Sequence, residues 1–231
     1  MSLLDAEPIY KPFHYPWAYD AWLTQQRIHW LPEEVPLADD VKDWRHKLSA
    51  GERNLLTQIF RFFTQADVEV NNCYMRHYSR VFKPTEIQMM LSAFSNIETV
   101  HISAYSHLLD TLGMPEVEYR AFLKYKEMKD KYDFMQQWGV DTREDIAKTL
   151  AVFGAFTEGL QLFASFAMLL NFPRFQDEGH GSDRHLVGAR RDAAHQLDHP
   201  AVPDLPEGEP GHLDRAGAAR PLCRLLDHRR P

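Results

Sequence analysis

One apolar segment carries residues that can bind metal and store an electron hole, all at helical spacing. Glu98, His101 and Tyr105 stand three and four residues apart, so a helix places carboxylate, imidazole and phenol on one face. Phe94 and Leu108 share this face, which predicts that it is buried. A buried charge is costly unless it is paired or bound to metal. A Glu-x-x-His pair that faces into a helical bundle forms half of a dinuclear iron or manganese site, whereas an isolated pair is often only solvated.

Two further acids interrupt apolar helical stripes. Asp67 is the one acid in a stripe that contains Leu56, Phe60, Phe63, Val70 and Tyr74. Its competitor Glu69 points about 200° away on the helical wheel and is more easily solvated than Asp67. Glu158 is the only ionisable residue between Leu150 and Leu170, where it must be protonated or held by a cation. We predict that both Asp67 and Glu158 bind metal, although Asp67 could instead be a buried acid satisfied by an arginine or the backbone.

The apolar run around Glu158 is also long enough to cross a bilayer. Glu158 stands at its centre and Gln161 follows, and the sequence contains no comparable second segment. A helix that is apolar on all faces is equally typical of the centre of a large soluble core. We therefore expect a core helix and no membrane association.

Composition excludes several other classes of protein. The 231 residues carry a net charge of −7, which disfavours nucleic-acid binding because such proteins usually present a basic face. Cys73 and Cys223 provide no disulfide framework, and the N-terminus has no basic stretch followed by an apolar one. Both features favour a cytoplasmic location.

Long helices must position these side chains, and no strand pattern is present. Ser49 and Glu52 form a capping-box signature at a helix start, and Gly113 marks a helix end. The predicted helices cover residues 15–29, 49–82, 84–113, 115–138 and 141–171. Helices near thirty residues are far longer than average and indicate a long-helix bundle with its cofactor site in the core.

These residues together resemble the small, radical-generating subunit of ribonucleotide reductase, over about residues 8 to 175. The resemblance implies a ferritin-like bundle with a dinuclear iron or manganese centre. The ligands that it implies in this sequence are Asp67, Glu98, His101 and Glu158. Tyr105 matches the tyrosine that stores the radical, and Trp30, in Trp-Leu-Pro-Glu-Glu-Val, matches the tryptophan that carries an electron near the metal.

The resemblance also implies a function and partners. In the family, the reduced metal pair reacts with molecular oxygen and oxidises the tyrosine. The resulting hole passes to a cysteine of a separate large subunit, which reduces ribonucleotides to deoxyribonucleotides, and the small subunit works as a homodimer. Two alternatives share the bundle: a ferritin-like oxygenase or fatty-acyl desaturase, against which Tyr105 and Trp30 argue, and a non-enzymatic iron-binding bundle.

The composition changes abruptly after residue 175. Residues 1–175 contain every Phe, Tyr and Trp, whereas residues 176–231 have none, and also lack Ile, Met, Lys, Asn and Thr. A segment without large apolar residues cannot offset the entropy of its own ordering. We therefore expect one folded domain, 1–175, which is the N-terminal part of the family domain, and a non-folding tail, 176–231.

The family requires a second Glu-x-x-His pair, preceded by an Asp, which the tail does not contain. Read one base further along, the codons of residues 176–195 can encode Lys-Met-Lys-Gly-Met-Gly-Gln-Ile-Val-Thr-Trp-Ser-Val-Arg-Asp-Glu-Thr-Leu-His, which resembles the missing helix. A shifted frame is therefore favoured, and the chain is expected to be truncated and impaired. The alternatives are a natural disordered tail, or replacement of the missing ligands by Asp192 and His195.

Overall fold

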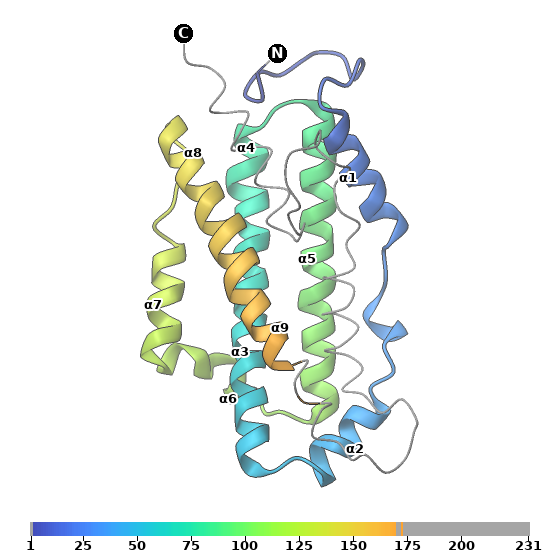
Figure 1. Ribbon diagram of the computed structural model, residues 1–231, viewed down its shortest axis with the longest axis vertical. Helices are drawn as coiled ribbons and strands as arrows, with labels where there is room; N and C mark the ends of the chain where they lie inside the picture. The colour runs from blue at the N-terminus through green and yellow to red at the C-terminus, as the bar shows by residue number, and fades with distance from the viewer. Residues whose placement is uncertain (1, 170–171, 173–231) are drawn as a thin grey trace.

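The computed structural model describes residues 2–169 and 172, and this part of the chain is helical with connecting loops and no strand. Figure 1 shows two long antiparallel rods, α3 (Ala50–Asn72) and α5 (Thr85–Leu112), crossed by a third long rod. The helix α1 (Pro16–Arg27) packs along the first half of α5. The predicted all-α long-helix fold is thus confirmed. The predicted tail, with Asp192 and His195, lies outside the described residues.

The rod that carries Asp67 begins with the predicted capping box. Ser49 Oγ accepts a hydrogen bond from Glu52 N at 3.3 Å, and Glu52 Oε2 accepts one from Ser49 N at 2.7 Å. These two bonds satisfy backbone donors that a helix start leaves unpaired. The rod continues through one π-helical segment, η2 (Cys73–Tyr78), and a last turn, α4 (Ser79–Val81), which confirms the predicted helix 49–82.

The rod that carries Glu98 and His101 also has the predicted ends. Pro84 is the N-cap of α5, and Gly113 follows the last turn with φ +74°. This left-handed conformation is unfavourable for residues with a Cβ, so glycine suits the helix end. The short link between α4 and α5 makes the two rods antiparallel neighbours, and it brings the middle of α3 against the middle of α5.

The predicted single helix over 115–138 is wrong. The segment forms three short helices, α6 (Val117–Arg120), η3 (Ala121–Lys124) and α7 (Lys126–Met135). The break lies at Tyr125, whose backbone is extended and whose hydroxyl accepts hydrogen bonds from Gln58 at 3.0 Å and Arg61 at 3.2 Å. Arg61 also pairs with Glu118. These contacts with α3 override the local helical periodicity, which cannot reveal them.

The third rod consists of α8 (Arg143–Leu150), η4 (Ala151–Leu162) and α9 (Phe163–Leu169). Thr142 caps it, since its hydroxyl accepts a hydrogen bond from Asp145 N at 3.1 Å. This confirms the predicted start of the fifth helix. By length and composition the rod is able to cross a membrane, and 50% of its most apolar window is buried inside the fold. A core helix meets the same criterion.

Two short elements are absent from the sequence prediction: η1 (Pro32–Glu34) and α2 (Ala38–His46). Elements of three and nine residues are too short to show a reliable hydrophobic period. They link α1 to α3, and α2 lies beside the lower end of α5 (Figure 1). The predicted helix 15–29 corresponds to α1.

Two large apolar clusters make up most of the core, and the predicted ligands lie between them together with a small third cluster around Trp30. The first cluster contains Phe60, Tyr105 and Phe166, and the second contains Cys73, Leu91 and Phe153. On α3 the first cluster ends at Ala66 and the second begins at Cys73. On α5 the second cluster ends at Leu91 and the first resumes at Tyr105. On the third rod the second cluster ends at Phe153 and the first resumes at Leu162. The predicted ligands therefore occupy the level where all three rods pass from one apolar cluster to the other.

Glu86 holds the start of α1 against α5, and its removal should destabilise the fold. Its buried carboxylate accepts hydrogen bonds from His14 N and Tyr15 N, each at 2.8 Å. Glu86→Ala leaves both backbone donors without this acceptor, so we expect a loss of about 2–3 kcal/mol in the free energy of unfolding, measured with urea. Glu144→Ala removes only an exposed pair with Lys148 and should leave the midpoint nearly unchanged. Equal midpoints for the two variants would contradict this role.

Candidate functional site

Three of the four predicted metal ligands meet between α3 and α5. Asp67 on α3 and Glu98 and His101 on α5 each offer an oxygen or nitrogen atom, and these atoms lie within 4.8 Å of one another. The exposed fractions are 1%, 1% and 2%. Glu98 and His101 face Asp67 because they are one turn apart on the buried side of α5. Side chains so deeply buried retain charge only with a partner or a metal.

The donor set matches the metals that the sequence predicts. His101 Nδ1 lies 3.3 Å from Glu98 Oε2, so the imidazole and the carboxylate approach the same point. Carboxylate oxygens with a few imidazole nitrogens are suited to divalent iron and manganese, whereas thiolates favour zinc or copper. The one described cysteine, Cys73, is outside the three-residue cluster. The residues present therefore fit an iron or manganese centre.

Glu158 is buried on the third rod but does not belong to this cluster. Its exposed fraction is 6%. Burial is the main reason why the pKa of the Cys73 thiol is raised, and the negative charge of Glu158 raises it further. The structure brings three predicted ligands together and places the fourth on the adjacent rod at the same polar level.

The helix around Glu158 is π-helical, which the sequence prediction did not include. In η4 the Thr157 hydroxyl donates to the carbonyl oxygen of Val152, five residues earlier, at 3.1 Å. A π-helix has more residues per turn than an α-helix, so side chains after it face a different direction. Gly154 and Gly159 flank this site, and glycine weakens the regular α-helix. The glycine pair is the one sequence signal that points to the irregularity.

Tyr105 lies in an apolar, aromatic environment. Its exposed fraction is 2%, and its ring stacks on Phe63 with centroids 5.1 Å apart and an angle of 25° between the planes. Phe63 also packs against Phe166 of α9, with 5.1 Å between the two ring centroids. Tyr105 follows His101 by four residues, so it lies one turn further along the same face of α5.

Trp30 reaches the cluster from a loop. It lies between α1 and η1, and its ring centroid is 6.3 Å from that of His101. Its exposed fraction is 7%, and it packs with Ile97 and Val100 of α5. The structure thus places an indole ring directly against a predicted ligand, although 71 positions separate Trp30 from His101.

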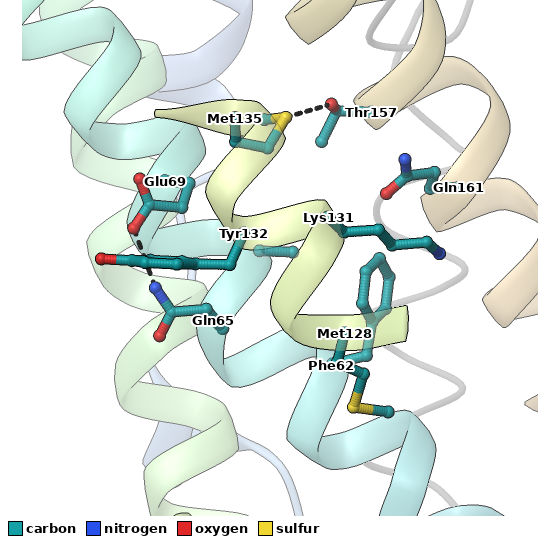
Figure 2. A pocket seen from close by; sticks show the side chains of 10 residues that line it. Phe62, Gln65, Glu69, Met128, Lys131, Tyr132, Met135, Thr157 and Gln161 are labelled. Carbon is teal, nitrogen blue, oxygen red and sulfur yellow. Dashed lines mark hydrogen bonds between the residues drawn. The ribbon is translucent and has the colours of Figure 1, made fainter. Parts of the chain in front are cut away.

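Glu69 is more exposed than Asp67, as the sequence predicts, but it is still buried. Glu69 is 8% exposed, and its carboxylate accepts hydrogen bonds from Gln65 Nε2 at 2.8 Å and from Gln136 Nε2. Gln136 directly follows α7, which covers this side of α3 (Figure 2). The helical wheel of α3 alone cannot show which neighbour covers it. Glu69 nevertheless lies outside the three-residue cluster, as its angle on the wheel predicts.

Comparison with known proteins identifies a family and a fold. Residues 9–177 match the family described as "Ribonucleotide reductase, small chain". Over 187 residues the chain is 48% identical to the probable ribonucleoside-diphosphate reductase small subunit 376L of Invertebrate iridescent virus 6. This alignment covers 75% of the chain and 52% of the relative. The chain therefore spans about half the length of the curated relatives that it matches.

Solved structures show the same fold at low sequence identity. The Rnr4 homodimer of the ribonucleotide reductase of Saccharomyces cerevisiae has a TM-score of 0.71 at 17% identity, over 99% of this chain and 67% of that one. An R2-like ligand-binding oxidase with a reconstituted Mn/Fe cofactor has a TM-score of 0.60 at 15% identity, over 90% of this chain and 72% of that one. These structures confirm the ferritin-like architecture, and together with the family match they show that the chain belongs to the ribonucleotide reductase small-chain family.

Proposed function

We propose that this chain belongs to a ribonucleoside-diphosphate reductase as its radical-generating small subunit. One observation carries the proposal: buried Asp67, Glu98 and His101 converge within 4.8 Å, and a buried phenol, Tyr105, lies one helical turn from His101. The buried phenol one turn from His101 favours a radical-generating subunit over a non-enzymatic iron-binding bundle. The names of the relatives support the same class of oxidoreductase.

Three acids and one imidazole of the polar layer would hold a pair of iron or manganese ions: Asp67, Glu98, Glu158 and His101. Such a pair, reduced and exposed to molecular oxygen, supplies the oxidising power for removal of one electron from a nearby phenol. The chain itself provides hard oxygen donors and one imidazole at a level of the bundle that is closed by apolar clusters on both sides. The Mn/Fe cofactor of the similar oxidase supports a metal pair of this kind.

Tyr105 would store the radical. Its 2% exposure and the stacked Phe63 ring separate the phenol from water and from soluble reductants, which lengthens the life of a reactive radical. The apolar cluster around it contains no other phenol in the described part of the chain that is fully buried. A one-electron oxidation beside the metal site would therefore leave its radical on the buried phenol of Tyr105.

Trp30 would carry the electron between the metal site and the protein surface. Its ring lies 6.3 Å from the imidazole of His101, and its position on a loop next to η1 brings it near the outside of the bundle. The final acceptor of the hole would be a cysteine of a separate large subunit, where ribonucleotides are reduced. Removal of the indole would break this transfer without removing a metal ligand.

The partners follow from the family. We propose a homodimer that associates with the large subunit in the cytoplasm, and the homodimeric yeast relative supports the dimer. The net charge of −7 supports the absence of nucleic-acid binding. Half of the most apolar window of the third rod is buried inside the fold, which supports a role as a core helix over membrane association.

The chain as its sequence stands should bind metal weakly and at a single site. It retains four of the six protein ligands that the resemblance implies, and loss of outer partners alone lowers metal affinity by roughly 10- to 100-fold. We expect each chain to bind one ferrous or manganous ion with low affinity. We expect no stable radical after exposure to oxygen. Calorimetric titration and electron paramagnetic resonance measure these two properties.

Matched variants on α5 identify the site. His101→Ala should abolish the remaining metal binding, whereas His107→Ala, an exposed histidine six residues later, should not change it. Two tightly bound metals per chain, or equal affinities of the two variants, would show that the metal is held elsewhere. A radical in the unmodified chain would show that the four ligands already suffice.

A further inference from the structure

A pocket that the proposed reaction does not use lies between α3, α7 and η4. Figure 2 shows that side chains from all three helices converge on it. The pocket is open to solvent, and the space inside it together with its mouth amounts to about 420 Å³. We call it the α7 pocket. Its lining residues are Phe62, Gln65, Ala66, Glu69, Met128, Lys131, Tyr132, Met135, Thr157 and Gln161.

Most of the exposed wall of the α7 pocket is apolar and adaptable. Phe62 contributes an aromatic ring, and Met128 and Met135 contribute thioethers from α7. Methionine is flexible and polarizable, so a wall of this kind adapts to alkyl chains or rings of different shape. The Met135 sulfur also accepts a hydrogen bond from the Thr157 hydroxyl at 3.4 Å, which fixes one side of the wall to η4.

The pocket is lined by two charged side chains, Lys131 and Glu69, and only Glu69 has hydrogen-bond partners among the described residues. Neighbouring lysines of α7 show how Lys131 differs. Lys126 and Lys129 of α7 pair with Asp130 and Asp133, whereas Lys131 has no carboxylate within 4 Å among the described residues. The Lys131 ammonium instead lies 5.1 Å from the centre of the Phe62 ring. In Figure 2, Lys131 extends from α7 in the direction of η4, where Gln161 lies. A ligand anion would therefore meet a cation that has no acidic partner in the described part of the chain.

The opposite side of the pocket is anionic and already hydrogen-bonded. Glu69 accepts hydrogen bonds from the amides of Gln65 and Gln136. Its carboxylate needs no further donor, and it repels a second negative charge on a ligand. A ligand that suits the whole pocket therefore has one anionic end and an uncharged remainder.

We propose that the α7 pocket binds a small amphipathic monocarboxylate, with its carboxylate on Lys131 and its hydrocarbon chain against Phe62, Met128 and Met135. The ammonium supplies a charge-assisted hydrogen bond, and the wall removes the hydrocarbon from water. Ala66 and Thr157 line the pocket and directly precede Asp67 and Glu158 in the chain. The site is thus adjacent to the ligand-bearing segments but uses none of the proposed metal ligands.

Three probes of related structure test each part of the proposal on the full chain. Octanoate carries tail and charge, 1-octanol carries the tail alone, and octanedioate adds a second carboxylate. With methyl-labelled methionine, octanoate should shift the NMR signals of Met128 and Met135 in a saturable way, and the signal of exposed Met75 should stay in place. Octanol and octanedioate should each bind more weakly. Unchanged Met128 and Met135 signals, or equal binding of octanol, would overturn the proposal.

Charge variants on α7 give the decisive comparison. Lys131→Met keeps the aliphatic stem, so it should weaken octanoate by roughly five- to tenfold, the loss expected for one partly solvated charge-assisted hydrogen bond, and leave octanol unchanged. Lys129→Met removes a lysine two positions away that is paired with Asp133 and should have no effect. Equal octanoate affinity in both variants would assign the binding to the apolar wall alone and reject the carboxylate site.

Discussion

Restoring the alternative reading frame after Phe175 should turn a chain without a radical into one that forms a stable tyrosyl radical with iron or manganese and oxygen. The restored sequence is expected to add the second Glu-x-x-His pair and the Asp before it, so that six ligands would replace four. Direct ligands contribute more to metal affinity than their outer partners, whose removal already costs roughly 10- to 100-fold. We expect two metals per restored chain and a tyrosyl signal in electron paramagnetic resonance, both absent from the unmodified protein.

Tyr105→Phe in the restored chain should abolish the radical and leave the fold intact. The variant removes only the phenol oxygen, and the ring still packs on Phe63. Tyr78→Phe is the matched control, because Tyr78 is also buried but belongs to the other apolar cluster, where its hydroxyl donates to the Thr149 carbonyl. That variant should keep the signal. With the large subunit, the restored chain should reduce ribonucleotides, and Tyr105→Phe should not.

Two outcomes contradict these expectations separately. A restored chain that binds two metals but carries its radical on another residue would refute the assignment of Tyr105. A stop codon soon after the restored junction, read directly from the gene, would refute the shifted frame and leave the metal cluster of the described part unaffected.

The second large effect concerns self-association of the chain as its sequence stands. The third rod exposes large apolar side chains at helical spacing, with exposed fractions of 56% for Phe156, 61% for Leu160, 54% for Phe163 and 42% for Met168. The first three stand four and three residues apart along the rod, and all three are more than half exposed. Contiguous apolar patches beyond a few hundred Å² are rare on soluble monomers. We expect the chain to form oligomers or aggregates at micromolar concentration.

Polar substitutions at these three positions should reverse the association. Replacing Phe156, Leu160 and Phe163 by glutamine, which is a good helix former, should raise the monomer fraction in sedimentation velocity by roughly tenfold or more. Ile9→Gln is the control, because Ile9 is 59% exposed but lies far along the chain from the rod. Cooperative unfolding of the unmodified chain as a monomer at high concentration would contradict the prediction.

Local patterns in the sequence determined the elements that carry the site. The capping box at Ser49 and the glycine at position 113 predict the ends of α3 and α5, because caps act through hydrogen bonds and φ angles within a few residues. The spacing of Glu98, His101 and Tyr105 predicts a shared face, and all three are buried there. Asp67 in the apolar stripe of α3 could also be found this way, since the stripe shows which side faces the core.

Only the tertiary structure decided how these elements meet. The break at Tyr125 depends on Arg61 and Gln58 of another helix, and the burial of Glu69 depends on α7. The position of Trp30 against His101 depends on the path of a loop. In each case the energy comes from contacts between residues far apart in the chain, whereas periodicity and capping report only on neighbours within a few turns. The same limit explains the α7 pocket, whose walls come from three segments that no local pattern connects.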